Sequence, residues 1–92
     1  QLDYTIKFLN TYQIKQIIIH WKEFGESNGY VNQWSLGNIS GGGREKIAGG
    51  EFPNTNTTII NKKFNASEIN ITAQSDKNWI GIYELEIIGR PI

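Results

Sequence analysis

The chain has 92 residues, a formal net charge of zero and no cysteine. This length allows a single domain, residues 1–92, and not two. The interspersed charges argue against nucleic-acid binding, the missing thiols exclude disulfides and thiolate metal sites, and no apolar run reaches the roughly 20 residues that a membrane-spanning helix needs.

The apolar composition favours strands over helices. Isoleucine dominates it, with three Trp, four Tyr and four Phe, and methionine is absent. β-Branched and aromatic side chains suit a pleated, half-buried surface. Gly, Asn, Ser and Pro interrupt the apolar runs at intervals of about 8–12 residues, as in all-β domains. In chain order, we predict seven strands at residues 4–9, 14–21, 30–39, 44–48, 57–64, 68–74 and 79–89.

Period-two alternation assigns faces to these strands. In the second strand, Ile17, Ile19 and Trp21 share one face, and Ile18 and His20 the other. In the third strand the apolar face holds Trp34 and Leu36, and in the sixth it holds Ile69, Ile71 and Ala73. In the last strand Leu85 and Ile87 share one face, and Glu84 and Glu86 share the other.

Seven strands without a long helix predict an antiparallel β-sandwich or jelly roll. If successive strands alternate in direction, the connections sort onto two ends of the domain. One end collects residues 22–29, 49–56 and 75–78. The other collects residues 10–13, 40–43 and 65–67 together with the C-terminus.

Two segments resemble discoidin-like domains, which are also called coagulation factor V/VIII type C domains. The first is IKFLNTYQIKQIIIHW (residues 6–21), similar to the central motif of that family. The second is WIGIYELEIIG (residues 79–89), similar to its closing strand. The N-terminal strands and the paired cysteines of many members have no counterpart, so the chain resembles a shortened member.

The resemblance implies a jelly-roll sandwich that belongs to the galactose-binding type. Such a domain binds sugars, phospholipid head groups or proteins through loops at the end opposite its termini. In this chain that end would carry residues 22–29, 49–56 and 75–78.

Catalytic signals are weak, and we expect no enzyme. His20 is the only histidine, and no serine stands in a Gly-x-Ser-x-Gly context. Glu84 and Glu86 could act as a glycosidase pair across a cleft, but a solvated face is the simpler interpretation.

The run Gly41-Gly42-Gly43 lacks the spacing of a phosphate-binding loop and predicts a hairpin connection, with close approach to a ligand as the alternative. We expect no cofactor and no metal. A structural calcium ion bound by loop carbonyls with Glu51 or Asp76 stays open as an alternative.

Aromatic residues suggest the chemistry of the binding end. Trp34 is expected in the core, whereas Trp21 ends one strand and Trp79 begins another at that end; closing the core is the alternative for both. Sugar rings stack on aromatic faces, and their hydroxyls bond to amides and charged groups. The predicted carbohydrate-binding residues are Trp21, Lys22, Glu26, Asn28, Tyr30, Asn54, Asp76, Asn78 and Trp79.

We therefore expect a carbohydrate-binding module or small lectin whose partners are glycans or glycoproteins. Affinity per site would be about millimolar to micromolar, so adhesion would need multivalency through a homo-oligomer or tandem domains. The alternative is a cell-adhesion module that binds phospholipid head groups or a protein. Membrane lipid ranks lower, because the loops are rich in Asn and not in apolar spikes.

Four Asn-x-Ser/Thr sequons, at Asn38, Asn56, Asn65 and Asn70, are candidate glycosylation sites. They favour an extracellular or cell-surface location, although the lack of cysteine points weakly the other way. Whether Gln1 is a processed terminus or a domain boundary stays open.

Overall fold

The computed structural model describes residues 2–24, 33–50, 57–74 and 79–92, and every regular element in them is a β-strand. The strands are β1 (Leu2–Phe24), β2 (Gln33–Asn38), β3 (Glu45–Gly50), β4 (Thr57–Ile60), β5 (Phe64–Gln74) and β6 (Trp79–Pro91). The all-β prediction is confirmed. The described residues contain no helix of the length and apolarity that spanning a membrane requires.

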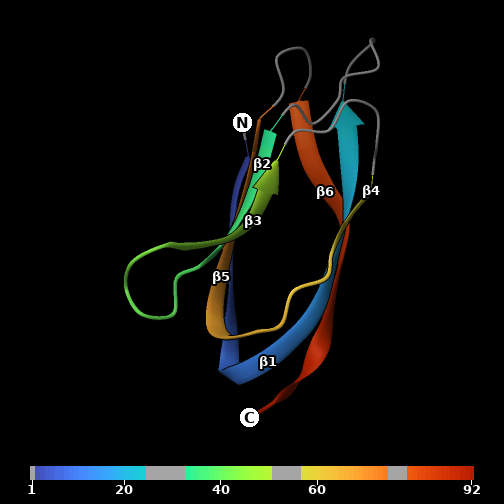
Figure 1. Cartoon of the computed structure of the whole chain (residues 1–92). Coiled ribbons are helices and arrows are strands. Elements are labelled where there is room, and N and C mark those ends of the chain that lie inside the picture. Colours follow the sequence, from blue (N-terminus) through green and yellow to red (C-terminus); the bar gives the residue numbers. More distant parts are fainter. Residues whose placement is uncertain (1, 25–32, 51–56, 75–78) are drawn as a thin grey trace.

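All six strands belong to one sheet, and the predicted antiparallel pairing is confirmed. Its order is β3-β2-β5-β1-β4, and β6 also pairs with β1. The sheet curls into a half-barrel with two limbs (Figure 1). One limb holds β3, β2, β5 and the first half of β1, and the other holds β4, the second half of β1, and β6.

Strand β1 joins the two limbs and merges the first two predicted strands into one. Its first half pairs with β5 from Leu2–Ala73 to Lys7–Glu68, and its second half pairs with β4 and β6. At the bend, residues 8–11 lie opposite the single residue Ser67. The turn signal Asn10-Thr11 therefore marks a large bulge inside a continuous strand, which increases local bending. The structure has six strands for this reason.

The hydrophobic core fills the space between the limbs. Ile17, Ile19, Leu36, Ile69 and Ile71 are completely buried. Each such side chain contributes about 1.5–3 kcal/mol of transfer free energy. The predicted apolar faces of the second, third and sixth strands are confirmed. The full buried apolar set is Ile14, Ile17, Ile19, Trp21, Trp34, Leu36, Ile60, Ala66, Ile69, Ile71 and Ala73.

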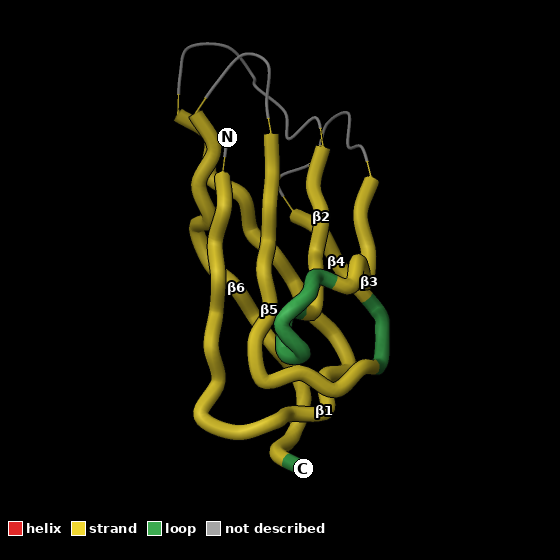
Figure 2. The backbone as a smooth tube through the Cα atoms, turned by 90° about the vertical axis from the view of Figure 1, so that its left-hand side faces the viewer, coloured by secondary structure: helices red, strands yellow, loops and turns green. Residues whose placement is uncertain are grey.

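The chain ends differ from the arrangement that the resemblance implies. Leu2 pairs with Ala73, next to the end of β5, so the N-terminal side of β1 lies at the end where β5 finishes and β6 begins. The C-terminus lies at the opposite end (Figures 1 and 2). The expected binding end is therefore opposite the C-terminus, but the N-terminal side of β1 lies at the same end as the expected site. The reason is that β1 runs along one limb, bends, and returns along the other.

Candidate functional site

Three strand ends meet where the sequence predicts the binding end. Gln33 begins β2, Gly50 ends β3 and Gln74 ends β5. Because β2 lies between β3 and β5, Gln33 stands opposite Gln74, and Trp34 stands opposite both Gly50 and Ala73. Gln33, Gly50 and Gln74 directly adjoin segments 25–32, 51–56 and 75–78.

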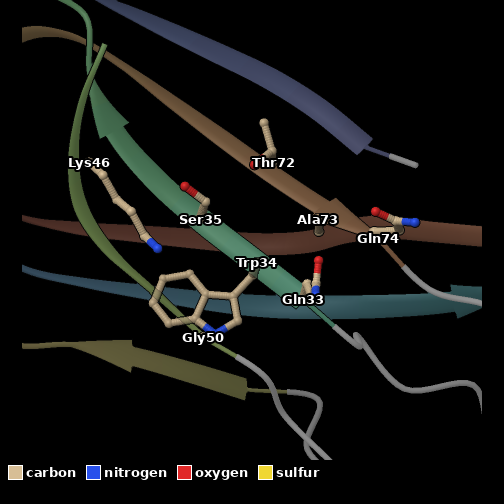
Figure 3. Close-up of a pocket in the computed structure, with 8 residues that line it drawn as sticks. All are labelled: Gln33, Trp34, Ser35, Lys46, Gly50, Thr72, Ala73 and Gln74. Atoms are coloured by element: carbon tan, nitrogen blue, oxygen red, sulfur yellow. The ribbon is translucent and has the colours of Figure 1, made fainter.

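A depression of ≈330 Å³ lies at this corner of the sheet (Figure 3). The side chain of Lys46 extends from β3 toward Trp34 and Ser35 of β2, and Thr72 lies on the neighbouring β5. Gly50 contributes no side chain beside the indole. The lining residues are Gln33, Trp34, Ser35, Lys46, Gly50, Thr72, Ala73 and Gln74.

The lining chemistry suits a ligand with many hydroxyl groups. Gln33 and Gln74 supply amides that both donate and accept, and Ser35 and Thr72 supply hydroxyls. Ser35 and Thr72 are directly opposed in the register, which places them on one face of the sheet. Lys46 adds an ammonium donor, and the lining set holds no carboxylate. Trp34 is 8% exposed, so it offers no open stacking face.

Trp21 belongs to the core, which is the alternative that the sequence left open for it. Its side chain is 4% exposed, and its Nε1 donates a hydrogen bond of 2.8 Å to Oγ1 of the buried Thr58. The ring faces are therefore covered, and a role in stacking against a sugar is not supported by this position.

The other predicted binding residues divide into two groups. Lys22 is exposed on β1 opposite Gly81, and Trp79 begins β6, where its backbone pairs with Phe24. The remaining predicted binding residues lie outside the described residues: Glu26, Asn28, Tyr30, Asn54, Asp76 and Asn78. Glu51, which was named with Asp76 as a possible calcium ligand, lies outside them as well.

The sequons differ in how accessible they are. Asn70 is 8% exposed: its Nδ2 donates to Asp3 and Thr5, and its Oδ1 accepts from Arg44. A glycan on Nδ2 would have to displace the hydrogen bonds to Asp3 and Thr5. Asn65 is exposed. Asn38 is half-buried and donates to the Asn65 carbonyl, and Asn56 lies outside the described residues.

The glycine run forms the predicted hairpin connection between β2 and β3. Gly42 has a φ of 93°, which favours glycine, and its N–H donates to the Ile39 carbonyl. The Ser40 hydroxyl accepts from the Ser67 and Glu68 amides and so anchors the connection to β5. A second depression of ≈400 Å³ lies beside it, lined by Asn38, Ser40, Gly41, Gly43, Arg44 and Glu45.

One cluster was not foreseen as a unit. Sequence alternation placed His20, Glu84 and Glu86 on outward faces, but the pairing of β1 with β6 brings them together. His20 Nε2 lies 2.7 Å from Glu86 Oε2 and 3.6 Å from Glu84 Oε2. The alternating pattern in each strand was the available signal, and strand pairing was the missing information.

No protein-family description matches the chain. No curated protein matches it either.

Proposed function

We propose that this domain is a non-catalytic carbohydrate-binding module or small lectin, and that glycans bind at the corner depression between β2, β3 and β5. The observation that carries the proposal is a single depression whose lining residues include two amides, two hydroxyls and one ammonium. Hydrogen-bonding groups in fixed positions are what a sugar with several hydroxyls requires.

The position of the depression supports the proposal further. Its lining residues adjoin segments 25–32, 51–56 and 75–78, which hold most of the predicted binding residues. The proposal includes the discoidin-like, jelly-roll relationship, in which the two limbs correspond to the two layers of a sandwich. It also includes an extracellular or cell-surface location.

The affinity of such a shallow site would be weak. Its sides are short polar groups, and binding must offset the loss of translational and rotational freedom. Adhesion would therefore depend on several domains acting together, as a homo-oligomer or as tandem copies.

A glycan array tests the proposal. The tagged domain is displayed on a tetrameric carrier, with Thr72→Val as the site variant and Thr11→Val, an exposed position away from the depression, as the matched control. We expect a related set of glycans to bind to the wild type and to Thr11→Val, and more weakly to Thr72→Val. Repeating the array with chelator examines the calcium alternative. A blank array from folded, tetrameric protein would overturn the proposal.

One observation favours the alternative, an adhesion module with a protein partner. Ile59 and Ile88 are 58% and 46% exposed. On the outer face of β4, β1 and β6, Ile59 stands opposite the half-buried Ile18, and Ile88 lies diagonal to it, opposite Gln16. Isolated exposed aliphatic residues are common, but three on one sheet face offer apolar contact area. Protein-array binding that is lost in Ile59→Ser, together with a blank glycan array, would favour this alternative.

A further inference from the structure

A mixed group of three potential metal ligands lies on the outer face of the second limb. His20 of β1 stands opposite Glu84 of β6, and Glu86 follows two residues along the same strand. Directly paired residues, and residues two apart in a strand, point to one face of the sheet. The fold therefore presents one imidazole and two carboxylates to a common point.

The distances between the donor atoms fit one small cation. The imidazole nitrogen and one oxygen from each carboxylate all lie within 4.8 Å of one another. Zinc binds nitrogen and oxygen ligands at about 2.0–2.2 Å, which places neighbouring tetrahedral ligands about 3.3 Å apart. The His20–Glu86 and His20–Glu84 separations of 2.7 and 3.6 Å lie on either side of that value.

The charges in this cluster are incompletely balanced. Two carboxylates share one imidazole, and among the described residues His20 alone lies within ion-pair distance of either of them. Ile18 stands opposite Glu86, and Ile59 stands on the other side of Ile18. An apolar border lowers the local dielectric and strengthens attraction to a cation. A divalent ion between the two carboxylates would relieve their mutual repulsion.

We propose that His20, Glu84 and Glu86 form a binding site for a divalent transition-metal ion, with Zn²⁺ as the ion that the donor set fits best. Imidazole nitrogen together with carboxylate oxygen suits first-row metals. Ca²⁺ takes six to eight oxygen ligands, and three protein donors that include a nitrogen suit it poorly.

Binding would couple the metal to the fold. The ion would bind Nε2 in place of its hydrogen, and the neutral imidazole would then carry its one proton on Nδ1. It would also link β1 to β6, which is an outer strand of its limb. The three side chains are 29%, 59% and 47% exposed, so a fourth coordination position faces solvent and accepts water or an anionic ligand.

Calorimetric titration of the chelator-treated protein with ZnCl₂ tests the site. We compare the wild type with His20→Gln and Glu86→Gln, and with Glu45→Gln, an exposed glutamate outside the cluster, as the control. We expect one ion per chain in the wild type and the control, and affinity reduced by about tenfold or more in both site variants. Circular dichroism of each variant checks that the sheet is intact.

The imidazole gives a second, direct readout because His20 is the only histidine. We expect its ring ¹⁵N signals to shift on addition of Zn²⁺ and not on addition of an equal concentration of Ca²⁺. Two results would overturn the proposal: unchanged ring signals at millimolar Zn²⁺ in the wild type, or equally tight Zn²⁺ binding by folded His20→Gln protein. Neither depends on whether the domain binds glycans.

Discussion

Trp21 and Thr58 form a buried hydrogen bond across the junction of β1 and β4. Nε1 of the indole donates to Oγ1 of the threonine at 2.8 Å, and the two residues are 4% and 2% exposed. A buried donor that loses its acceptor keeps the full cost of desolvation, about 1–3 kcal/mol.

Thr58→Val should therefore destabilise the domain by about 1–3 kcal/mol, although valine has nearly the same shape as threonine. Urea unfolding followed by tryptophan fluorescence measures the effect. Thr11→Val, at an exposed position, is the control and should change stability little. Equal stability of the two variants would show that the bond contributes nothing.

Gly89 is required by the close approach of β6 to β1. A Cβ atom at Gly89 would collide with the carbonyl oxygen of Gln13 and lie 3.0 Å from the Cα of Ile14. These are backbone atoms of the paired strand, so relief requires the strands to separate.

We expect Gly89→Ala to cost about 1–3 kcal/mol by overpacking. Gly43→Ala is the matched control, because a Cβ there meets nothing within 4 Å and its φ is not in the left-handed region. Thermal unfolding of both variants measures the difference. A Gly89→Ala protein as stable as Gly43→Ala would contradict the close packing of β6 against β1.

Asn70 ties together β1, β5 and the start of β3 on the outer face of the first limb. Its Nδ2 lies 2.7 Å from Asp3 Oδ1 and 3.1 Å from Thr5 Oγ1, and its Oδ1 accepts from Arg44 Nε at 3.0 Å. Asn70→Ala removes all three bonds and should destabilise the fold by about 1–3 kcal/mol.

Chemical denaturation of Asn70→Ala against Asn65→Ala measures this effect. Asn65 is exposed. It accepts a hydrogen bond from Asn38 through its backbone carbonyl, which the substitution keeps. A loss of stability no larger than that of the control would show that solvent replaces the amide without cost.

The core could be predicted from the sequence because the core pattern is local. Alternation alone identified Ile17 and Ile19, and likewise Ile69 and Ile71, as buried residues on shared faces, and all four are completely buried. The turn signal at Asn10-Thr11 was also informative. The signal produces a bulge and not the end of a strand, because β5 and β6 pair with Tyr12, Gln13 and Ile14 on both sides. These long-range pairings cannot be read from a local sequence pattern.

The candidate sites depend on contacts between distant residues and were harder to foresee. Ser35 and Thr72 line one depression although they are 37 positions apart in the sequence. His20 contacts Glu86 although 66 positions separate them. The sequence placed each side chain on a face but did not specify which strands become neighbours. The position of Trp21 was likewise left open by the sequence, since an aromatic residue at a strand end looks the same whether it closes the core or faces a ligand.

Lys46 should contribute to glycan affinity and not to stability. It is exposed, it lines the depression, and it has no carboxylate within ion-pair distance among the described residues. Removing a charged donor to a ligand hydroxyl at such a site costs about 1 kcal/mol, or about fivefold in affinity.

Titration with a glycan that binds to the wild type compares Lys46→Ala with the control Lys62→Ala. Lys62 is an exposed lysine outside the depression. A fivefold loss in the first variant only is expected. Equal affinities would remove Lys46 from the site.

The most direct measurement of the central claim is a ¹H–¹⁵N NMR titration of the ¹⁵N-labelled domain with a glycan selected from the array. We predict that the largest shifts fall on the Trp34 indole N–H, the Gln33 and Gln74 side-chain amides, and the backbone amides of Ser35 and Thr72. Shifts confined to other surfaces, with these signals unmoved at saturation, would contradict the placement of glycan binding at the corner of β2, β3 and β5.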